Sequence, residues 1–226
     1  MTLSRRLAAE GLGSLILAAT VIGSGIMAQR LASGNMAVAL IANTGATVAV
    51  LAVLIALLAP LSGAHFNPAV SLVQALRKVM AWRDAGLYAL VQIAGCCVGV
   101  LLAHAMFELP LMQSSLHVRA GPAQWLSEAV ATFGLLLVVL GPVRPQNTPW
   151  MVAGWIGAAY WFTASTSFAN PAITIARSLS DTFAGIRPQD APAFVVAQLV
   201  GALTGYCTAR ALFAPAVIPS SRISQH

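Results

Sequence analysis

The sequence has little charge, since Asp, Glu, Lys and Arg together make up 8% of its 226 residues. Soluble domains carry roughly 25% charged residues, so this composition excludes a water-soluble globular protein. Cysteine is also scarce, and all three cysteines fall in apolar segments, which argues against a disulfide framework. The net charge of +6 is explained by basic residues that flank the apolar segments. It therefore gives no indication of a nucleic-acid partner.

What the sequence has instead is long apolar stretches, and its mean hydropathy is +0.82. A helix needs about 20 apolar residues to cross ~30 Å of hydrocarbon. Two further helical segments, 67–78 and 170–180, are too short to cross alone. The predicted fold class is therefore an all-α membrane protein with two short helices and six spans, over residues 7–29, 35–59, 84–107, 123–141, 150–167 and 190–213.

The same tripeptide begins both short segments, as Asn67-Pro68-Ala69 and again as Asn170-Pro171-Ala172. Asparagine is a favoured helix N-cap, and proline is well tolerated at the first helical position. Both copies lie in charge-free runs, residues 31–76 and 145–176, and so at membrane depth. Broken helices are tolerated there only inside protein or beside a watery cavity. We therefore predict two re-entrant half-helices that border a pathway through the bilayer.

Two further features repeat with the tripeptides. The pattern Gln92-x-x-Gly95-x-x-x-Gly99 in the third span recurs as Gln198-x-x-Gly201-x-x-x-Gly205 in the sixth. Glycines four residues apart let two helix backbones approach closely. Each half holds three spans, an odd number, so the second half must enter the membrane inverted. We predict one channel domain over residues 1–226, with inverted repeats at about 5–108 and 123–213 joined by the loop 109–122.

Glu10 and Glu128 are the carboxylates that lie well inside predicted spans, in the first and the fourth. An intramembrane acid is a candidate functional group. Because the two acids are duplicated with the fold, we interpret them as scaffold residues that accept hydrogen bonds from the backbone of the re-entrant loops. Coupling to protons or ions is the alternative.

The distribution of basic residues predicts the orientation in the membrane. With both termini in the cytoplasm, the four basic residues on the outer side are Arg30, Arg119, Arg177 and Arg187. The other eight then lie on the cytoplasmic side: Arg5, Arg6, Arg77, Lys78, Arg83, Arg144, Arg210 and Arg222. Eight against four favours cytoplasmic N and C termini.

These features together resemble the aquaporin family, the major intrinsic proteins, and the resemblance covers nearly the whole chain. The strings Ser62-Gly63-Ala64-His65-Phe66-Asn67-Pro68-Ala69-Val70 and Phe168-Ala169-Asn170-Pro171-Ala172 carry it. The resemblance implies a passive channel for small neutral solutes in a bacterial inner membrane, usually a homotetramer with one pore per subunit. It implies no cofactor, no metal and no enzyme activity.

In that family the two asparagines lie at the centre of the pore. Asn67 and Asn170 would each donate an amide N–H to a passing oxygen, while the oxygen of the same amide caps the half-helix. Both helix N-termini would face the midplane, where their partial positive charge disfavours cations. His65 would line the cytoplasmic vestibule, or lie buried with its ring satisfied by the protein.

Selectivity in the family comes mainly from four positions on the outer side of these motifs. Counting from the two asparagines, these positions hold Thr47, Ala158, Ser167 and Ile173. Water-selective and glycerol-conducting members have aromatic residues and an arginine in this set. Here the residues are small or aliphatic, so we predict a wide, uncharged selectivity filter.

Arg177 follows Ile173 by four residues, on the same face of the expected half-helix. It is expected in the outer vestibule, where its side chain pairs with Asp181, again four residues on, or reaches interfacial water. The alternative is that Arg177 leans back over the pore and replaces the arginine missing at position 173.

The run from Thr163 to Arg177 resembles one bacterial branch, the arginine-less aquaglyceroporins associated with arsenic resistance. That resemblance implies permeation by arsenous acid, As(OH)3, together with glycerol-like polyols and water. Arsenous acid is neutral at physiological pH and presents three hydroxyls, as a polyol does. The alternatives are a secondary transporter built from inverted repeats, or a water-selective channel.

Overall fold

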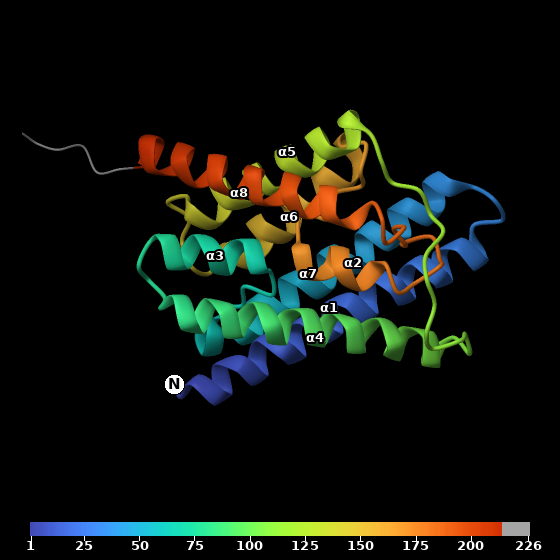
Figure 1. Ribbon diagram of the computed structural model, residues 1–226, viewed down its shortest axis with the longest axis horizontal. Helices are drawn as coiled ribbons and strands as arrows, with labels where there is room; N and C mark the ends of the chain where they lie inside the picture. The colour runs from blue at the N-terminus through green and yellow to red at the C-terminus, as the bar shows by residue number, and fades with distance from the viewer. Residues whose placement is uncertain (214–226) are drawn as a thin grey trace, which may run out of the picture.

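The computed structural model describes residues 1–213, which are helical with connecting loops and re-entrant turns. The helices run roughly parallel to one long axis, as a single bundle (Figure 1). Arg222, which the sequence assigns to the cytoplasmic side, lies outside the described residues. The helices are α1 (Leu3–Leu31), α2 (Met36–Ser62), α3 (Pro68–Leu76), α4 (Trp82–Met106), α5 (Pro122–Leu140), α6 (Thr148–Phe162), α7 (Pro171–Arg177) and α8 (Ala191–Phe213).

Five of these helices, α1, α2, α4, α5 and α8, are long and apolar enough to cross a membrane. The fifth predicted span, 150–167, is wrong at its end, because α6 stops at Phe162 and a turn and a re-entrant loop follow. The half-helix predicted over 170–180 also ends early, at Arg177. The all-helical fold class itself is confirmed.

Local sequence explains where the helices of the first half begin and end. The Asn35 side chain accepts hydrogen bonds from the amides of Ala37 and Val38, and so caps the start of α2. Gly63 ends the same helix with a φ of 92°, a left-handed conformation that glycine adopts without steric cost. This turn directs the chain back toward the centre of the bundle, where α3 begins.

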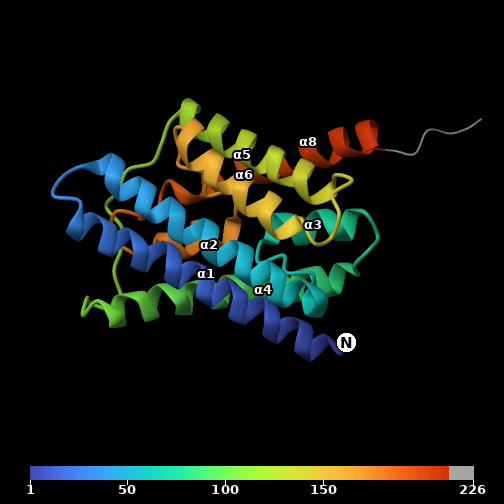
Figure 2. The same ribbon diagram turned by 180° about the vertical axis from the view of Figure 1, so that it is seen from behind.

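Two tightly packed helix pairs form opposite walls of the bundle. Helix α1 packs along α4, and α5 packs along α8 (Figures 1 and 2). A Cβ built on Gly95 would overlap the Gly11 carbonyl oxygen, and one on Gly205 would lie 2.7 Å from the Phe133 carbonyl oxygen. Both pairs therefore depend on glycine for close approach of their backbones.

The two half-helices lie roughly in line, with their N-termini facing each other near the centre of the bundle (Figures 1 and 2). We call the end where α1 begins and α8 finishes the terminal end, and the opposite end the loop end. Helix α3 extends from the centre toward the terminal end, and α7 extends toward the loop end. The chain therefore enters the middle of the bundle from both ends.

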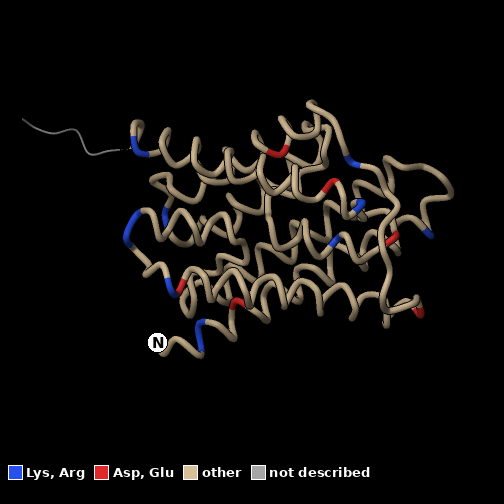
Figure 3. Tube along the Cα trace, in the orientation of Figure 1, with Lys and Arg blue, Asp and Glu red and all other residues tan. Residues whose placement is uncertain are grey.

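Charged residues lie mostly at the two ends of the bundle, and few occur along its middle (Figure 3). The helix faces directed outward carry large apolar side chains, including Leu57, Leu90, Leu126 and Val196, each more than half exposed. An apolar band between two charged ends suits a hydrocarbon surrounding.

Candidate functional site

Asn67 and Asn170 join the two half-helices at the centre of the bundle. The Asn67 side-chain nitrogen donates to the Ala169 carbonyl at 2.7 Å, and the Asn170 nitrogen donates to the Phe66 carbonyl at 2.8 Å. Their side-chain oxygens accept from the amides of Ala69 and Ala172, each two residues on. Each side-chain amide has two N–H groups, so the second stays free to meet a solute.

The backbone before each asparagine is left-handed at equivalent positions. Ala64 and Phe66 have φ values of 48° and 46°, and Ser167 and Ala169 have values of 48° and 47°. This conformation costs roughly 1–2 kcal/mol for a residue with a Cβ, so other contacts must hold it. It directs the Phe66 and Ala169 carbonyls at the asparagine of the opposite loop.

Two buried glutamates supply those contacts. Glu10 accepts hydrogen bonds from the amides of His65 and Phe66 at 3.0 and 2.7 Å. Glu128 accepts from the amides of Phe168 and Ala169, both at 2.9 Å. Both side chains are fully buried, and their oxygens are occupied by these donors. The arrangement suits holding a backbone and leaves little capacity for proton exchange.

A glutamine from a neighbouring helix completes each of these networks. Gln92 of α4 donates to Glu10 at 2.8 Å and to Ser71 at 3.1 Å. Gln198 of α8 makes the equivalent bonds to Glu128 at 2.6 Å and to Thr174 at 2.8 Å. Each loop is therefore tied to two wall helices as well as to the other loop.

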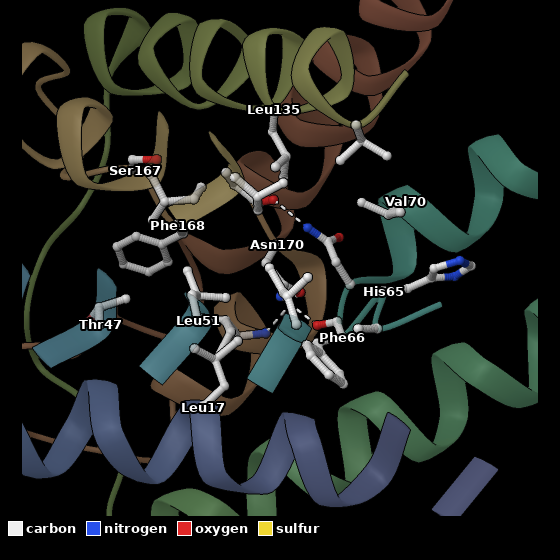
Figure 4. Close-up of a pocket in the computed structure, with 18 of the residues that line it drawn as sticks. Leu17, Thr47, Leu51, His65, Phe66, Val70, Leu135, Ser167, Phe168 and Asn170 are labelled. Atoms are coloured by element: carbon white, nitrogen blue, oxygen red, sulfur yellow. Dashed lines mark hydrogen bonds between the residues drawn. The ribbon is translucent and has the colours of Figure 1, made fainter. Parts of the chain in front are cut away.

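A cavity passes this junction and extends toward both ends of the bundle. Thr47, Ser167 and Phe168 lie on one side of Asn170, and His65 and Val70 lie on the other (Figure 4). Most of the wall is aliphatic, with the lining leucines Leu17, Leu51 and Leu135 among its members. The polar side chains of the wall include Asn67 and Asn170, with Thr47 and Ser167 toward the loop end and His65 toward the terminal end.

His65 lines the part of the cavity nearest the terminal end. Its ring Nδ1 is 3.0 Å from the Ser71 hydroxyl, and the ring centroid is 5.4 Å from that of Tyr88. The ring is half-buried, so it has a protein partner and also borders the cavity. The two possibilities raised by the sequence therefore coexist at this residue.

Three of the four positions assigned by counting from the asparagines line the cavity toward the loop end: Thr47, Ser167 and Ile173. Thr47 donates its hydroxyl to the Asn43 carbonyl at 2.9 Å. The Ser167 hydroxyl oxygen is buried and has no partner in the described part of the chain. It is therefore free to bond a solute in the cavity.

The fourth assignment, which placed Ala158 in the selectivity filter, is wrong. Ala158 is exposed on the outer face of α6, whereas Val152, Ile156 and Tyr160 face the cavity. Two residues along a helix turn the side chain by about 200°, so Ala158 and Tyr160 point in opposite directions. The Tyr160 hydroxyl lies 3.4 Å from the Thr47 hydroxyl. An aromatic side chain therefore borders the cavity where a small one was predicted.

The predicted pairing of Arg177 with Asp181 is also wrong. Arg177 is 3% exposed and lines the cavity, and its guanidinium carbon lies 3.4 Å from the centre of the Phe168 ring. Its Nε donates to the Ala184 carbonyl. Asp181 instead accepts from the Leu116 amide at 2.8 Å. Arg177 has no carboxylate partner among residues 1–213, so its charge borders the cavity uncompensated.

Sequence reasoning missed Tyr160 and Arg119. Tyr160 continues the four-residue spacing of Val152 and Ile156, and that periodicity was the available signal. Arg119 lies in the loop between the halves and is buried behind the cavity wall. No local pattern distinguishes it from a surface arginine, because its partners come from distant loops.

Residues 1–163 match the family described as Major intrinsic protein. Aquaglyceroporin AqpS of Rhizobium meliloti is 55% identical over 216 residues, which cover 95% of this chain and 92% of that protein. The probable aquaporin AqpM of Archaeoglobus fulgidus is 29% identical, over 90% of this chain and 94% of its own.

A similar arrangement exists among solved structures. The X-ray structure of the aquaglyceroporin from Plasmodium falciparum superimposes with a TM-score of 0.70 and covers 95% of this chain and 98% of its own. The two sequences are 18% identical in that superposition, so the likeness concerns the fold.

Proposed function

Because the chain belongs to the major intrinsic protein family, whose members are channels for water and small solutes, we propose that its own solutes are polyhydroxylated and neutral. Glycerol-like polyols and arsenous acid fit this description, and water accompanies them. The observation that carries the proposal is the cavity, whose wall combines many aliphatic side chains with a few polar ones, Asn67 and Asn170 among them. Such a lining suits molecules that have one apolar side and several hydroxyls.

The polar groups toward the loop end match the hydroxyls of these solutes. The free Ser167 hydroxyl can donate or accept, and the hydroxyls of Tyr160 and Thr47, which lie 3.4 Å apart, line the same cavity. The Arg177 guanidinium adds donors only. The three hydroxyls of one small solute could therefore each form a hydrogen bond with one of these groups. We propose that Thr47, Tyr160, Ser167, Ile173 and Arg177 form the selectivity filter.

We further propose one channel domain made of two inverted repeats, with both termini in the cytoplasm. The support is that α1 begins and α8 ends at the same end of the bundle, where most of the basic residues lie (Figures 1 and 3). We also propose that the protein lies in the lipid bilayer, because large apolar side chains cover the outer helix faces, and that it forms the homotetramer that its family resemblance implies. Native mass spectrometry showing a single chain would contradict that assembly.

A vesicle experiment tests the solute class. Liposomes that contain the purified protein are exposed to osmotic gradients of glycerol, urea or arsenous acid, or to an osmotic shock that reports on water alone. Their change in volume is followed by stopped-flow light scattering. We expect glycerol and arsenous acid to enter much faster than into protein-free vesicles, with no dependence on ion gradients. Entry that requires an ion gradient would instead identify a coupled transporter, a mechanism for which the fully bonded Glu10 and Glu128 leave no free acid.

The filter assignment is tested at two neighbouring positions of α6. Tyr160→Ala removes an aromatic ring from the cavity wall, so glycerol permeability should rise several-fold relative to water permeability. Ala158→Ser is the matched control, because this side chain faces away from the cavity, and the ratio should stay as in the unmodified protein. The reverse pattern would show that position 158, rather than 160, borders the solute path.

A further inference from the structure

A second arginine lies behind the filter, and it is held entirely by backbone carbonyls. The Arg119 side chain donates from Nε to Gly185 at 2.7 Å, from one terminal nitrogen to Ser165 at 3.2 Å, and from the other to Phe183 at 3.4 Å. Burial lowers the pKa of Arg119 to about 10, so the group remains charged at neutral pH. A buried guanidinium with no carboxylate partner is costly, and these carbonyl dipoles must offset the cost.

The carbonyls that hold Arg119 flank the one that holds Arg177. Phe183 and Gly185 accept from Arg119, and Ala184 between them accepts from the Nε of Arg177. The three consecutive peptide units are therefore shared between two guanidinium groups. If Arg119 were lost, the segment carrying the Ala184 carbonyl would lose the hydrogen bonds to the carbonyls on either side of it and would be held by the backbone bonds of Gly185 and Ile186.

Phe168 provides a second link between the two arginines. Its ring centre lies 3.4 Å from the guanidinium carbon of Arg177 and 5.1 Å from that of Arg119. Cations over an aromatic face are attracted by its quadrupole. The ring is fixed from another direction by Phe194, at 5.2 Å between centroids. Arg119 also binds Ser165, in the loop that positions Phe168.

Arg119 itself is anchored at its backbone. Its amide donates to an Asp190 carboxylate oxygen at 2.9 Å, and the other oxygen of that carboxylate accepts from Arg187 at 2.8 Å. The loop between the two halves of the chain therefore places Arg119 firmly, and Arg119 reaches from there to two loops of the second half. The contacts run from Arg119 through the 183–185 segment and Phe168 to Arg177.

From this geometry we propose that Arg119 is a positioning residue for solute selectivity, which acts by holding the Arg177 guanidinium in place beside the cavity. The inference rests on the proposed filter and adds a residue that does not itself line the cavity. The Arg177 side chain makes one hydrogen bond and one aromatic contact within the described residues, and Arg119 contacts or flanks the partners in both.

The test is a double-mutant cycle read as the ratio of glycerol to water permeability in proteoliposomes. A ratio does not depend on how many folded channels each vesicle holds, so a purely structural role would leave it unchanged. Arg119→Gln should raise the ratio about fivefold, in the same direction as Arg177→Ala, since it removes charge-assisted hydrogen bonds. In the Arg177→Ala background, Arg119→Gln should change the ratio no further.

Two more variants complete the test. Arg119→Lys keeps the buried charge but cannot reach three carbonyls, so its ratio should shift in the same direction by a smaller factor. Arg30→Gln removes a cation from the loop end without touching these loops, and its ratio should stay unchanged. This control tests whether the loss of any positive charge at the loop end is enough to change the permeability ratio.

The outcomes separate the inference from the filter on which it rests. If Arg177→Ala alters the ratio while both Arg119 variants leave it unchanged, the positioning role is wrong and the filter stands. If Arg119→Gln shifts the ratio equally with and without Arg177, the two residues act independently and the inference is also wrong. An unchanged ratio in Arg177→Ala would overturn the filter itself.

Discussion

Replacing Arg177 with alanine should open the channel to cations and widen it for bulky neutral solutes. The guanidinium borders the cavity and has no carboxylate partner among the described residues, so its charge acts on anything that passes. A unit charge about 5 Å from a cation at an effective dielectric constant of about 20 repels it by about 3 kcal/mol. Losing that barrier corresponds to roughly a hundredfold rise in cation flux.

Sodium entry into proteoliposomes, measured with an ion-sensitive dye, provides the readout. Arg177→Lys is the matched control, because it retains the charge but loses the planar contact with Phe168. We expect low cation flux in the lysine variant and high flux in the alanine variant. Equal, low flux in both would mean that the helix ends and asparagines alone reject cations.

Replacing Glu128 with alanine should prevent the protein from folding stably. The fully buried carboxylate accepts from two backbone amides and from Gln198, and alanine would leave both amides without a partner and Gln198 with its bond to Thr174 alone. Each unsatisfied buried donor costs about 1–3 kcal/mol. The Ser167 and Ala169 backbones are also left-handed here, so the loop would lose the contacts that hold this conformation.

Thermal unfolding in detergent, followed by size-exclusion chromatography, measures this effect. Glu108→Ala is a suitable control, since Glu108 is exposed in the loop after α4. We expect the control to elute as the unmodified protein does and the Glu128 variant to aggregate or to melt far earlier. A Glu128 variant with normal stability would show that the loop is held by other contacts.

Features encoded by short motifs could be predicted from the sequence. Asn67 and Asn170 each combine a helix cap with a proline at the first helical turn, and both signals are local. The glycine spacing in α4 and α8 likewise depends on neighbouring residues of one helix. These patterns indicated the two half-helices and a close approach at the glycines of α4 and α8, but they did not identify α1 and α5 as the partner helices.

Two predictions that counted residues across a helix end were wrong, although Thr47, counted across the end of α2, does line the cavity. Placing Ala158 in the filter assumed a fixed distance to Asn170, but α6 ends at Phe162, and Thr166, Ser167 and Ala169 are left-handed in the segment that follows. Pairing Arg177 with Asp181 assumed that α7 continues, yet it ends at Arg177 itself. The four-residue helical spacing therefore no longer brings these two side chains together.

The contacts of Arg119 could not be predicted from the sequence, for a different reason. Its partners are carbonyl oxygens of Ser165, Phe183 and Gly185, and a carbonyl oxygen occurs in every residue. Side-chain type therefore carries no information about such a contact, and only the folded loops bring these atoms together.

The reciprocal bonds between Asn67 and Ala169, and between Asn170 and Phe66, also constrain how the protein is made. A ribosome completes the first re-entrant loop long before it reaches the second. Until the second loop is synthesised, the side-chain amide of Asn67 and the backbone carbonyl of Phe66 lack these hydrogen-bond partners. The first half of the nascent chain therefore waits in an incomplete state, and the last helices to be synthesised close the junction for both halves at once.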